Sequence, residues 1–310
     1  MRVLITGATG LIGQEVVRRC HEREIDVNYL TTSISKIESR ANYKGYYWNP
    51  DTQDIDKNCF KDVEAIIHLA GISIAKRWTP SHKKEIISSR IKPTQLLINS
   101  LKGESHTIKQ VVSASAIGIY PDSLVNYYDE NFKSFKDTFL STVVQQWEQA
   151  VDGFSKLNIK VSKIRIGLVL SNKGGALEEM VKPIKYGLGA AFGSGKQWQS
   201  WIHIEDLSRM FMYILEYQLG GVYNGVAPNP VTNKELIKVI AKQLKRPIIL
   251  PNIPRFFMKL LLGEMHILLF ESQRVSSKKV ENKGFNYNYN YLKPALNDLL
   301  GKRIFAHDKN

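Results

Sequence analysis

Hydrophobic residues in the first half of the chain follow two alternating patterns. Short runs rich in β-branched residues predict strands, and apolar residues recurring every three to four positions between them predict helices. The runs are RVLITG at 2–7, VNYLTT at 27–32, AIIHLAG at 65–71, QVVSASA at 110–116 and KVSKIRIGLVL at 160–170. The longest helices are expected over 80–101 and 139–154. Because parallel crossovers are right-handed, this alternation predicts an α/β fold with a doubly wound parallel sheet.

From about residue 171 glycines become frequent, which predicts loops and shorter elements. We interpret residues 1–170 as one α/β domain and residues 171–310 as mostly a smaller C-terminal lobe. Two later segments, WIHIEDL at 201–207 and GGVYNGVA at 220–227, look like strands that return to the main sheet. NYNYNY at 286–291 is typical of an edge strand or a loop. Short helices are expected over 233–244 and 290–300.

Composition narrows the class of protein and its partners. Hydrophobic residues make up 43% of the 310 residues, enough for an extensive core. The formal net charge of +14 favours anionic partners such as phosphorylated cofactors. Most of the excess is a solvated lysine-rich surface in our interpretation, and no aromatic and basic platform accompanies it. We therefore expect a small-molecule substrate and no nucleic acid.

Cysteines and apolar segments indicate the compartment. Cys20 and Cys59 give neither a disulfide framework nor a metal-binding spacing, which fits a reducing cytoplasm and predicts no metal site. The chain begins at once with a strand pattern, so we expect no signal peptide. FFMKLLLGEMHILLF at 256–270 is too short and too charged to cross a bilayer, and a buried or amphipathic helix is expected there.

The motif that carries chemistry is GATGLIG at 7–13, between the first strand and the first helix. Gly7 permits the sharp turn, Gly10 lets the backbone approach a pyrophosphate, and Gly13 lets the helix pack closely on the strand. Thr9, Leu11 and Ile12 belong to the same cofactor-binding turn. The helix start then offers free N–H groups and a positive dipole end to the phosphates. Residues 1–170 are therefore predicted to be an NAD(P)-binding Rossmann domain.

The end of the second strand decides between the two nicotinamide cofactors. An acid there would bind the 2′-hydroxyl of NAD, and a basic group would accept the 2′-phosphate of NADP. Thr31 and Thr32 occupy the strand end without an acid, and Lys36 and Arg40 follow within reach. This pattern favours NADP, with NAD as the alternative.

Several further motifs follow in order: HLAGISIAKRWTPSHKKEIISSRIKPT, SASAIGIY, GSGKQWQSWIHIEDL, NGVAPNPVTNKEL, LLLGEM and SQRV. With GATGLIG they resemble, over nearly the whole chain, the epimerase-like branch of the extended short-chain dehydrogenases. This is the NAD-dependent epimerase/dehydratase family, including proteins described as sugar-nucleotide epimerases with a C-terminal domain of unknown function. The resemblance implies that domain at about 248–300 and leaves the substrate open.

The resemblance also implies further cofactor contacts. Leu69, Ala70 and Gly71 would line the cofactor, whereas His68 is expected to be a strand-end histidine with hydrogen-bonded nitrogens. Glu85 and Arg90 lie on the helix beneath the nicotinamide ribose in such relatives. Arg90 could pair with a phosphate, and a surface salt bridge is the equal alternative for both. The family's usual Thr-Arg or Ser-Arg at the second strand end is replaced here by two threonines.

The catalytic pattern of the family is incomplete in this chain. Short-chain dehydrogenases use a Ser or Thr and a Tyr-x-x-x-Lys, whose Lys lowers the pKa of the Tyr so that a phenolate can move the substrate proton. Ser115 matches the serine, but Leu140 and Val144 stand at the Tyr and Lys positions. Tyr120 is the best substitute, with a packing aromatic as its alternative, and Ser115 could equally satisfy local backbone groups. Weaker substitutes are Lys76, Arg77 and His203.

Two functions remain open at this point. The first is an NADP(H)-dependent oxidoreductase or isomerase with a substitute acid–base group. The second is a weakly catalytic NADP(H)-binding protein with a redox-sensing or regulatory role. On the substrate side the resemblance points to Lys196, Trp198 and Gln199. Gln199 replaces the arginine that grips a sugar-nucleotide diphosphate in relatives, and Lys196 lacks that arginine's planar fork. By analogy, a homodimer would form through the helices at 80–101 and 139–154.

Overall fold

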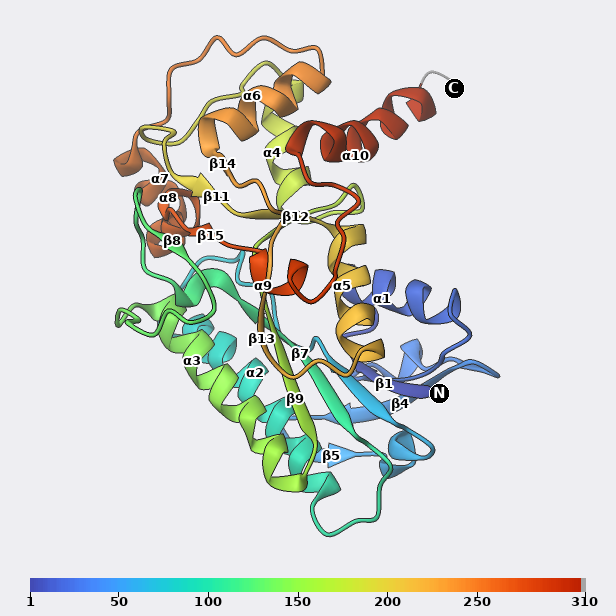
Figure 1. Cartoon of the computed structure of the whole chain (residues 1–310). Helices are drawn as coiled ribbons and strands as arrows, with labels where there is room; N and C mark the ends of the chain where they lie inside the picture. The colour runs from blue at the N-terminus through green and yellow to red at the C-terminus, as the bar shows by residue number, and fades with distance from the viewer. Residues whose placement is uncertain (308–310) are drawn as a thin grey trace.

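A nine-stranded sheet forms the lower half of the molecule in the computed structural model, which describes residues 1–307 and side chains up to residue 301 (Figure 1). Seven of its strands are parallel, and two short strands, β3 and β5, pair antiparallel with β4 at one edge. The order of the parallel strands is β4-β2-β1-β6-β7-β9-β13, so the direction of crossover reverses between β1 and β6. These strands are β1 (Arg2–Thr6), β2 (Asp26–Thr31), β4 (Tyr43–Asn49), β6 (Ala65–His68), β7 (Gln110–Ala116), β9 (Lys160–Ile166) and β13 (Gly221–Gly225). Ligands bind outside the carboxyl ends of the strands at such a reversal.

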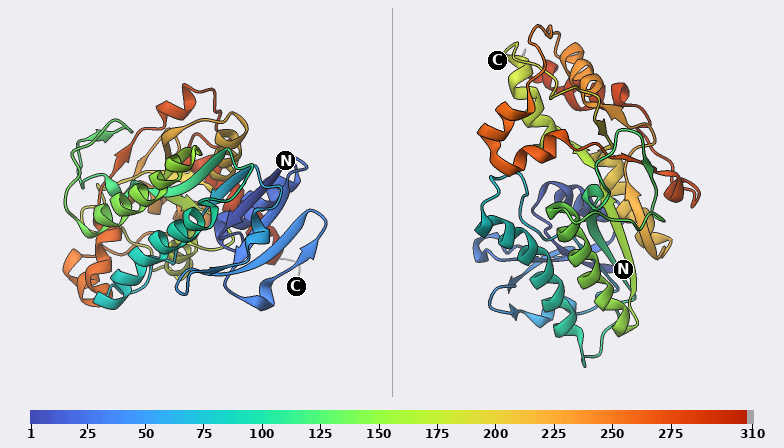
Figure 2. Two further views of the ribbon diagram at one scale, coloured as in Figure 1. Left: turned by 90° about the horizontal axis from the view of Figure 1, so that it is seen from below. Right: turned by 90° about the vertical axis from the view of Figure 1, so that its left-hand side faces the viewer.

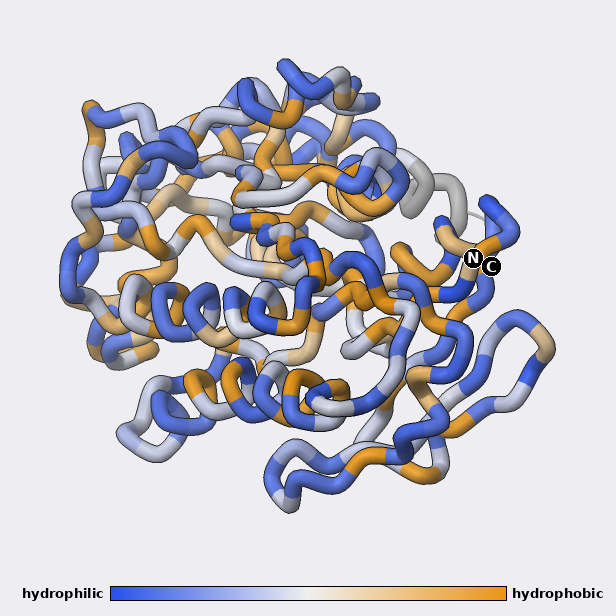
Figure 3. Tube along the Cα trace, turned by 60° about the horizontal axis from the view of Figure 1, so that its bottom comes forward, coloured by the Kyte–Doolittle hydropathy of each residue, from blue (hydrophilic) through white to orange (hydrophobic). Residues whose placement is uncertain are grey.

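Helices cover both faces of the sheet, as the alternating pattern predicted. Helices α1 (Leu11–His21) and α5 (Ile204–Glu216) pack together on one face, and α2 (Pro80–Leu101) and α3 (Phe139–Asp152) lie side by side on the other (Figures 1 and 2). Along the helices hydrophobic and polar residues alternate (Figure 3), the pattern of a helix that buries one face. Threonine side chains cap α2 and α3: Thr79 accepts from His82 N, and Thr138 from Ser141 N.

The C-terminal lobe has its own core above the sheet. Helices α4 (Ala176–Lys185), α6 (Asn233–Gln243) and α10 (Leu292–His307) enclose it together with Trp201, which is fully buried. Two small sheets support these helices: β10 (Leu168–Leu170) pairs with β12 (Trp201–His203), and β11 (Trp198–Gln199) with β14 (Val231–Thr232).

A hairpin of short helices in the C-terminal half packs against α2 and α3. It consists of α7 (Arg255–Leu262), η5 (Gly263–His266) and α8 (Ile267–Phe270). Met265 and Leu268 of the hairpin pack on a cluster that includes Trp78, Leu140 and Val143. The chain then forms β15 (Arg274–Val275), paired with β8 (Tyr127–Tyr128), and α9 (Lys278–Glu281). The remaining short elements are η1 (Ile34–Lys36), β3 (Ser39–Arg40), β5 (Asp54–Ile55), η2 (Lys57–Phe60), η3 (Ile117–Ile119) and η4 (Gly153–Leu157).

Most predicted elements are present, but one returning segment was assigned wrongly. GGVYNGVA supplies β13, which joins the main sheet beside β9, as predicted. WIHIEDL does not return to that sheet: its strand β12 pairs with β10 in the lobe. The expected strand over 160–170 is divided at Gly167, where a Cβ would lie 2.2 Å from the Ser200 carbonyl oxygen. NYNYNY is a loop. None of the described helices is both long and apolar enough to cross a membrane.

Candidate active site

The turn between β1 and α1 has the geometry of a phosphate-binding turn. Gly7 has a φ of +72°, and its carbonyl accepts a hydrogen bond from Gly10 N at 3.0 Å. A Cβ on Gly13 would lie 2.1 Å from the Gly7 oxygen, so only glycine permits this contact between helix and turn. No side chain caps the start of α1. The first helical turn, with Leu11 and Ile12, therefore leaves its N–H groups available to an anion.

The neighbouring loop after β6 is fixed by a buried histidine. His68 is fully buried, with Nδ1 at 2.8 Å from Thr6 Oγ1 and Nε2 at 3.0 Å from Thr94 Oγ1. The same Thr6 oxygen accepts hydrogen bonds from the backbone N–H groups of Leu69 and Ala70, both at 3.1 Å. Burial lowers the pKa of His68 to about 4, so the ring is neutral at physiological pH. The structure thus confirms that both nitrogens of His68 are hydrogen-bonded, and its role is to shape the loop.

A groove of about 580 Å³ opens at the carboxyl ends of β1, β2 and β6. We call it the cofactor groove. Of the predicted cofactor residues, its lining includes Gly7, Thr9, Thr31, Thr32, Ala70, Gly71 and Glu85. Gly10, Leu11, Ile12, Gly13 and Leu69 are not part of this lining and belong to the adjoining turn, helix start and loop. Lys36 also lines the groove, whereas Arg40 does not and pairs instead with Glu38 at 2.6 Å.

Arg90 stands between the groove and a second cavity. A Cβ on Gly71, which lines the groove, would lie 3.4 Å from Arg90 Cζ, and Arg90 itself lines the second cavity. Its guanidinium donates to the carbonyls of Ile86 and Ile72, and it lies 5.2 Å from the ring centre of Trp147. Burial lowers the pKa of Arg90 to about 10, which leaves it charged at neutral pH. Glu85 is exposed and 3.1 Å from His82 Nδ1, so Glu85 and Arg90 do not act together.

The second cavity, of about 210 Å³, is the reaction chamber in our interpretation. Leu140 and Val144, the residues at the Tyr and Lys positions of the family, both line it and are almost fully buried. Other apolar lining residues are Ile74, Ile117, Val143, Trp147 and Leu168, and the polar ones are Arg90, Trp198, Gln199, Ser200, Glu271 and Gln273. The two positions that the sequence resemblance assigns to the relay are therefore apolar side chains of the chamber wall.

Ser115 and Tyr120 do not line the chamber. Ser115 is 2% exposed and donates its hydroxyl proton to Glu148 Oε1 at 2.6 Å. Tyr120 is equally buried; its hydroxyl donates to Asn224 Oδ1 at 2.8 Å and accepts from Arg165 at 3.0 Å. Both hydroxyls are thus engaged in one buried network, and the catalytic roles expected for them lack geometric support.

The centre of this network is a buried ion pair between Arg165 of β9 and Glu148 of α3. Arg165 Nε and one terminal nitrogen contact the two carboxylate oxygens at 2.8 and 2.9 Å. Burial alone would raise the pKa of Glu148, but the hydrogen bonds and charge of Arg165 outweigh it and the pKa is lowered. Burial raises the pKa of Tyr120 to about 12 despite the nearby Arg165, so a phenolate is disfavoured at neutral pH.

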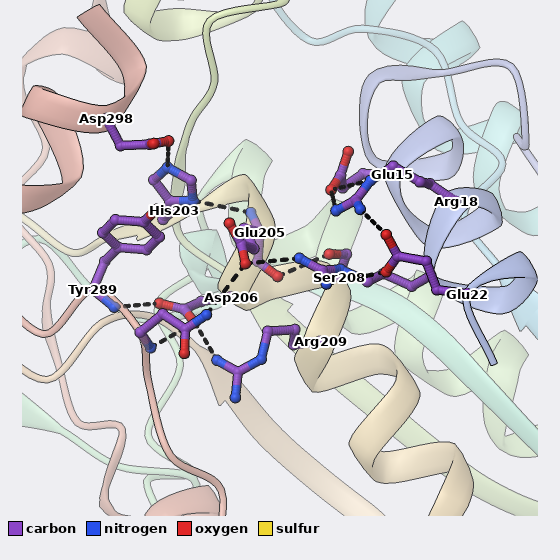
Figure 4. Close-up of polar contacts among 12 residues, drawn as sticks. Glu15, Arg18, Glu22, His203, Glu205, Asp206, Ser208, Arg209, Tyr289 and Asp298 are labelled. Atoms are coloured by element: carbon purple, nitrogen blue, oxygen red, sulfur yellow. Dashed lines mark hydrogen bonds and ion pairs between the residues drawn. The ribbon is translucent and has the colours of Figure 1, made fainter. Parts of the chain in front are cut away.

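The weaker catalytic candidates also lie outside the chamber. Lys76 and Arg77 are exposed and do not line it. His203 stacks on Tyr289 at 3.9 Å and faces the Asp298 carboxylate at 3.4 Å, in a separate polar cluster at the start of α5 (Figure 4). His203 caps that helix by accepting a hydrogen bond from Glu205 N. The carboxylate of Asp206, in the first turn of α5, accepts hydrogen bonds from the backbone N–H groups of residues 288 and 289, which fastens the C-terminal segment to α5.

The predicted substrate residues separate into two groups. Trp198 and Gln199 line the chamber, whereas Lys196 is exposed and lines neither cavity. Two chamber residues were missed from the sequence: Glu271 and Gln273, on either side of the SQRV motif's first residue. An acid directly after the apolar run ILLF was the available signal. Among the described residues, no group of three or more His, Cys, Asp or Glu side chains is placed to hold a metal ion.

Comparison with known proteins agrees with this arrangement. Residues 3–224 match the model of the NAD dependent epimerase/dehydratase family, and residues 253–299 match a domain of unknown function. The chain belongs to the NAD-dependent epimerase/dehydratase family. An epimerase family protein of Staphylococcus haemolyticus is 36% identical over 302 residues, covering 96% of this chain and 98% of the relative. A Staphylococcus aureus relative is 35% identical, covering 96% and 99%.

Solved structures of the family have the same fold. A human epimerase family protein crystallised with NADPH is 29% identical, with a TM-score of 0.84 over 97% of this chain and 99% of that one. UDP-glucuronic acid 4-epimerase from Bacillus cereus, solved with UDP-glucuronic acid and NAD, has a TM-score of 0.79 over 99% and 100%. At 15% identity the latter likeness concerns the fold alone. The matched C-terminal domain contains the hairpin, Glu271 and Gln273.

Proposed function

We propose that this family member binds NADP(H) and acts on a small molecule in the chamber as an oxidoreductase or isomerase. The observation that carries the proposal is the closeness of two cavities: the cofactor groove contains the Gly7 turn and Gly71, and Arg90, which lies against Gly71, lines the neighbouring chamber. The NADPH complex of the human relative supports it. Bound NADPH would supply a hydride; the chain's own side chains orient the substrate and exclude water.

Preference for NADP(H) follows from the end of β2. The cofactor groove is lined there by the hydroxyl residues Thr32 and Ser33 and by Lys36, all suited to a 2′-phosphate. One acid that lines the groove, Asp51, lies on the loop after β4, and its carboxylate accepts a hydrogen bond from Lys92 Nζ at 2.6 Å. A 2′-hydroxyl would therefore find no free strand-end carboxylate to bind.

The test is titration of the purified protein with NADPH and NADH, followed by cofactor fluorescence. We expect NADPH to bind more tightly. Lys36→Gln should weaken NADPH binding by about tenfold, the loss of one charge-assisted contact, and leave NADH binding unchanged. Arg40→Gln is the matched control and should change neither affinity, because Arg40 lies outside the groove. Equal binding of both cofactors by the wild type would overturn the preference, and binding of neither would overturn the function.

The chamber favours a small, uncharged substrate over a whole sugar nucleotide. Arg90 is the only basic residue among those that line it, and its guanidinium is already held by two carbonyls and Trp147. The sequence resemblance puts Gln199 at the position where relatives grip a diphosphate, and Lys196 is not among the residues that line the chamber. A diphosphate would thus enter an apolar cavity without a free positive partner, which is costly.

A second possible function is a binding protein without catalysis, and the apolar residues at the positions expected for the relay favour it. Leu140 and Val144 cannot titrate, and the network of Ser115 and Tyr120 is closed, so a binding protein that responds to the redox state of NADP(H) has support as well. Tight NADPH binding without NADPH oxidation across a broad panel of aldehydes, ketones and quinones would favour this function. Oxidation with any of them would favour the enzyme.

The homodimer through α2 and α3 stays a prediction. The exposed positions of α3 include Gln145, Gln146 and Gln149, a polar surface that suits a weak interface better than an obligate one. Light scattering over a concentration series would measure the association.

A further inference from the structure

The chamber contains one carboxylic acid that the family pattern does not assign. Glu271 lines the cavity from the residue that ends α8, on the wall supplied by the C-terminal hairpin, together with Leu268 and Gln273. Among the described side chains that line the chamber, Glu271 and Arg90 are the ionisable ones. Because Arg90 remains protonated, Glu271 is the group there that can both give and take a proton.

Glu271 has a neutral hydrogen-bond donor beside its carboxyl group and no ion-pair partner among the described side chains. Gln273 Nε2 lies 3.4 Å from Glu271 Oε2 and is itself anchored by donating to the Tyr120 carbonyl at 2.9 Å. No ion pair involving Glu271 is found among the described side chains. The carboxyl group is therefore positioned by a neutral amide rather than by a salt bridge.

Burial and two charged groups act on this carboxyl group, and a third charged group lines the same cavity. Burial is the main effect and Asp122, on the loop after η3, adds to it, while Arg255 of α7 opposes both; together they raise the pKa of Glu271 to about 7. Arg255 is in turn within 3.2 Å of His266 Nε2. Arg90 of α2 lines the same cavity. A carboxyl group poised near neutral pH suits proton transfer in either direction.

A structural role explains Glu271 poorly. Its backbone N–H closes α8 by donating to the Ile267 carbonyl, and any residue can do this. A negative charge at a helix C-terminus is electrostatically unfavourable. The side chain is also partly buried against an apolar cavity, where an acid costs more free energy than an amide.

We infer that Glu271 is the acid–base group of the chamber, in place of the tyrosine and lysine of the family. In the reductive direction the carboxyl proton on Glu271 passes to the carbonyl oxygen of the substrate while a hydride from the reduced cofactor bonds to the carbonyl carbon. The products are an alcohol, the oxidised cofactor and the Glu271 carboxylate. In the reverse direction the carboxylate takes the hydroxyl proton. This inference rests on the proposed NADP(H) function.

The first experiment needs no substrate. The nicotinamide ring of NADP⁺ is positively charged and that of NADPH is neutral, so a carboxylate beside it favours the oxidised form. The ratio of Kd for NADPH to Kd for NADP⁺ should rise with pH through a midpoint near 7, by about fivefold, the lower end of the effect of a nearby unit charge. Titration of the 2′-phosphate affects both forms and cancels in the ratio. In Glu271→Gln the ratio should be independent of pH.

The matched control is Glu264→Gln on the same hairpin, an exposed acid that pairs with Lys83 and does not line the chamber. It should retain the wild-type pH dependence. Carbon-13 NMR of protein labelled at the glutamate carboxyl carbons gives an independent readout. The signal missing in Glu271→Gln should titrate near pH 7 in the wild type, and Glu271→Asp serves for assignment if the amide variant folds poorly.

The outcomes separate the two proposals. Binding of both nucleotides with a ratio that is flat, or unchanged in Glu271→Gln, overturns the role of Glu271 and leaves the NADP(H) function standing. A carboxyl titration below pH 5 also overturns it. Binding of neither nucleotide overturns the proposed function and the inference with it. Where a carbonyl compound is reduced, kcat should fall at least about hundredfold in Glu271→Gln with KM little changed, a loss typical of a general acid.

Discussion

The two ends of the site depend on different parts of the chain. At the cofactor end the main chain makes most of the site: Gly7, Gly13 and the first amides of α1 shape the turn. At the chamber the lining side chains make the site, among them the apolar Leu140 and Val144. Under the proposed function, this difference would let cofactor binding and catalysis change separately on one fold. A protein can keep the first while the second is lost or moved to another residue.

The sharpest way to break the cofactor end is at Gly13. In Gly13→Ala the new Cβ would lie 2.1 Å from the Gly7 oxygen and 2.7 Å from Ala8 Cα, so the turn must move away from its phosphate-binding shape. We expect NADPH binding to weaken by at least about hundredfold in a calorimetric titration. Gly220→Ala is the control, since the nearest atom to its Cβ would be Lys160 Cγ at 3.4 Å, on a flexible side chain. Unchanged affinity in Gly13→Ala would show that the turn does not bind the phosphates.

At the chamber end the largest effect on stability is expected at Arg165. Arg165→Met leaves the buried Glu148 carboxylate with Ser115 as its remaining close partner, which should lower the free energy of unfolding by about 3–5 kcal/mol. Lys163→Met, two residues earlier on β9, removes a pair whose partner Asp152 is exposed, and about 0–1 kcal/mol is expected. Urea denaturation measures both. Equal losses in the two variants would contradict the structural role given to the buried pair.

Lowering the pH should destabilise the folded protein through His68, which shapes the loop at the cofactor end. The pKa of His68 is lowered from 6.5 to about 4 in the folded protein, so the unfolded chain binds the proton more readily. The stability that neutral His68 contributes is present above pH 6.5 and is lost as the pH falls toward 4, by about 3 kcal/mol. His68→Gln lacks this titration. The stability difference between wild type and variant should therefore shrink as the pH falls, and a constant difference from pH 7 to 4 would contradict the prediction.

Regular periodicity explains what could be predicted from the sequence. The helix over 80–101 and the strand over 110–116 have the predicted bounds, because each is long and packs with an uninterrupted pattern. The strand at 43–49, YKGYYWN, was missed because aromatic residues on both faces hide the alternation at this side of the sheet. The glycine turn was visible because its chemistry is contained in seven consecutive residues.

The chamber could not be predicted in the same way, because distant segments build it. Glu271 and Gln273 meet Leu140 and Arg90 only after the hairpin folds back over α2 and α3. Tyr120 follows Ser115 by five residues, and proximity in sequence suggested a shared catalytic role. Its hydroxyl instead meets Asn224, 104 positions away on β13. The partner of this hydroxyl depends on how β13 and the loop after β7 pack together, which the local sequence does not specify.

The smallest effect is expected at Tyr120 and Ser115, and it tests whether either hydroxyl acts in catalysis. Tyr120→Phe removes two buried hydrogen bonds, to Asn224 and from Arg165, and should lower the free energy of unfolding by about 1–2 kcal/mol. NADPH affinity and any measurable turnover should stay within about twofold, since Tyr120 does not line the chamber. Ser115→Ala should behave alike for the same reason. Stopped-flow NADPH oxidation beside urea denaturation measures both quantities on one sample. A turnover loss of about hundredfold with little change in stability would return Tyr120 to the role of proton donor and would contradict the separation between the two ends of the site.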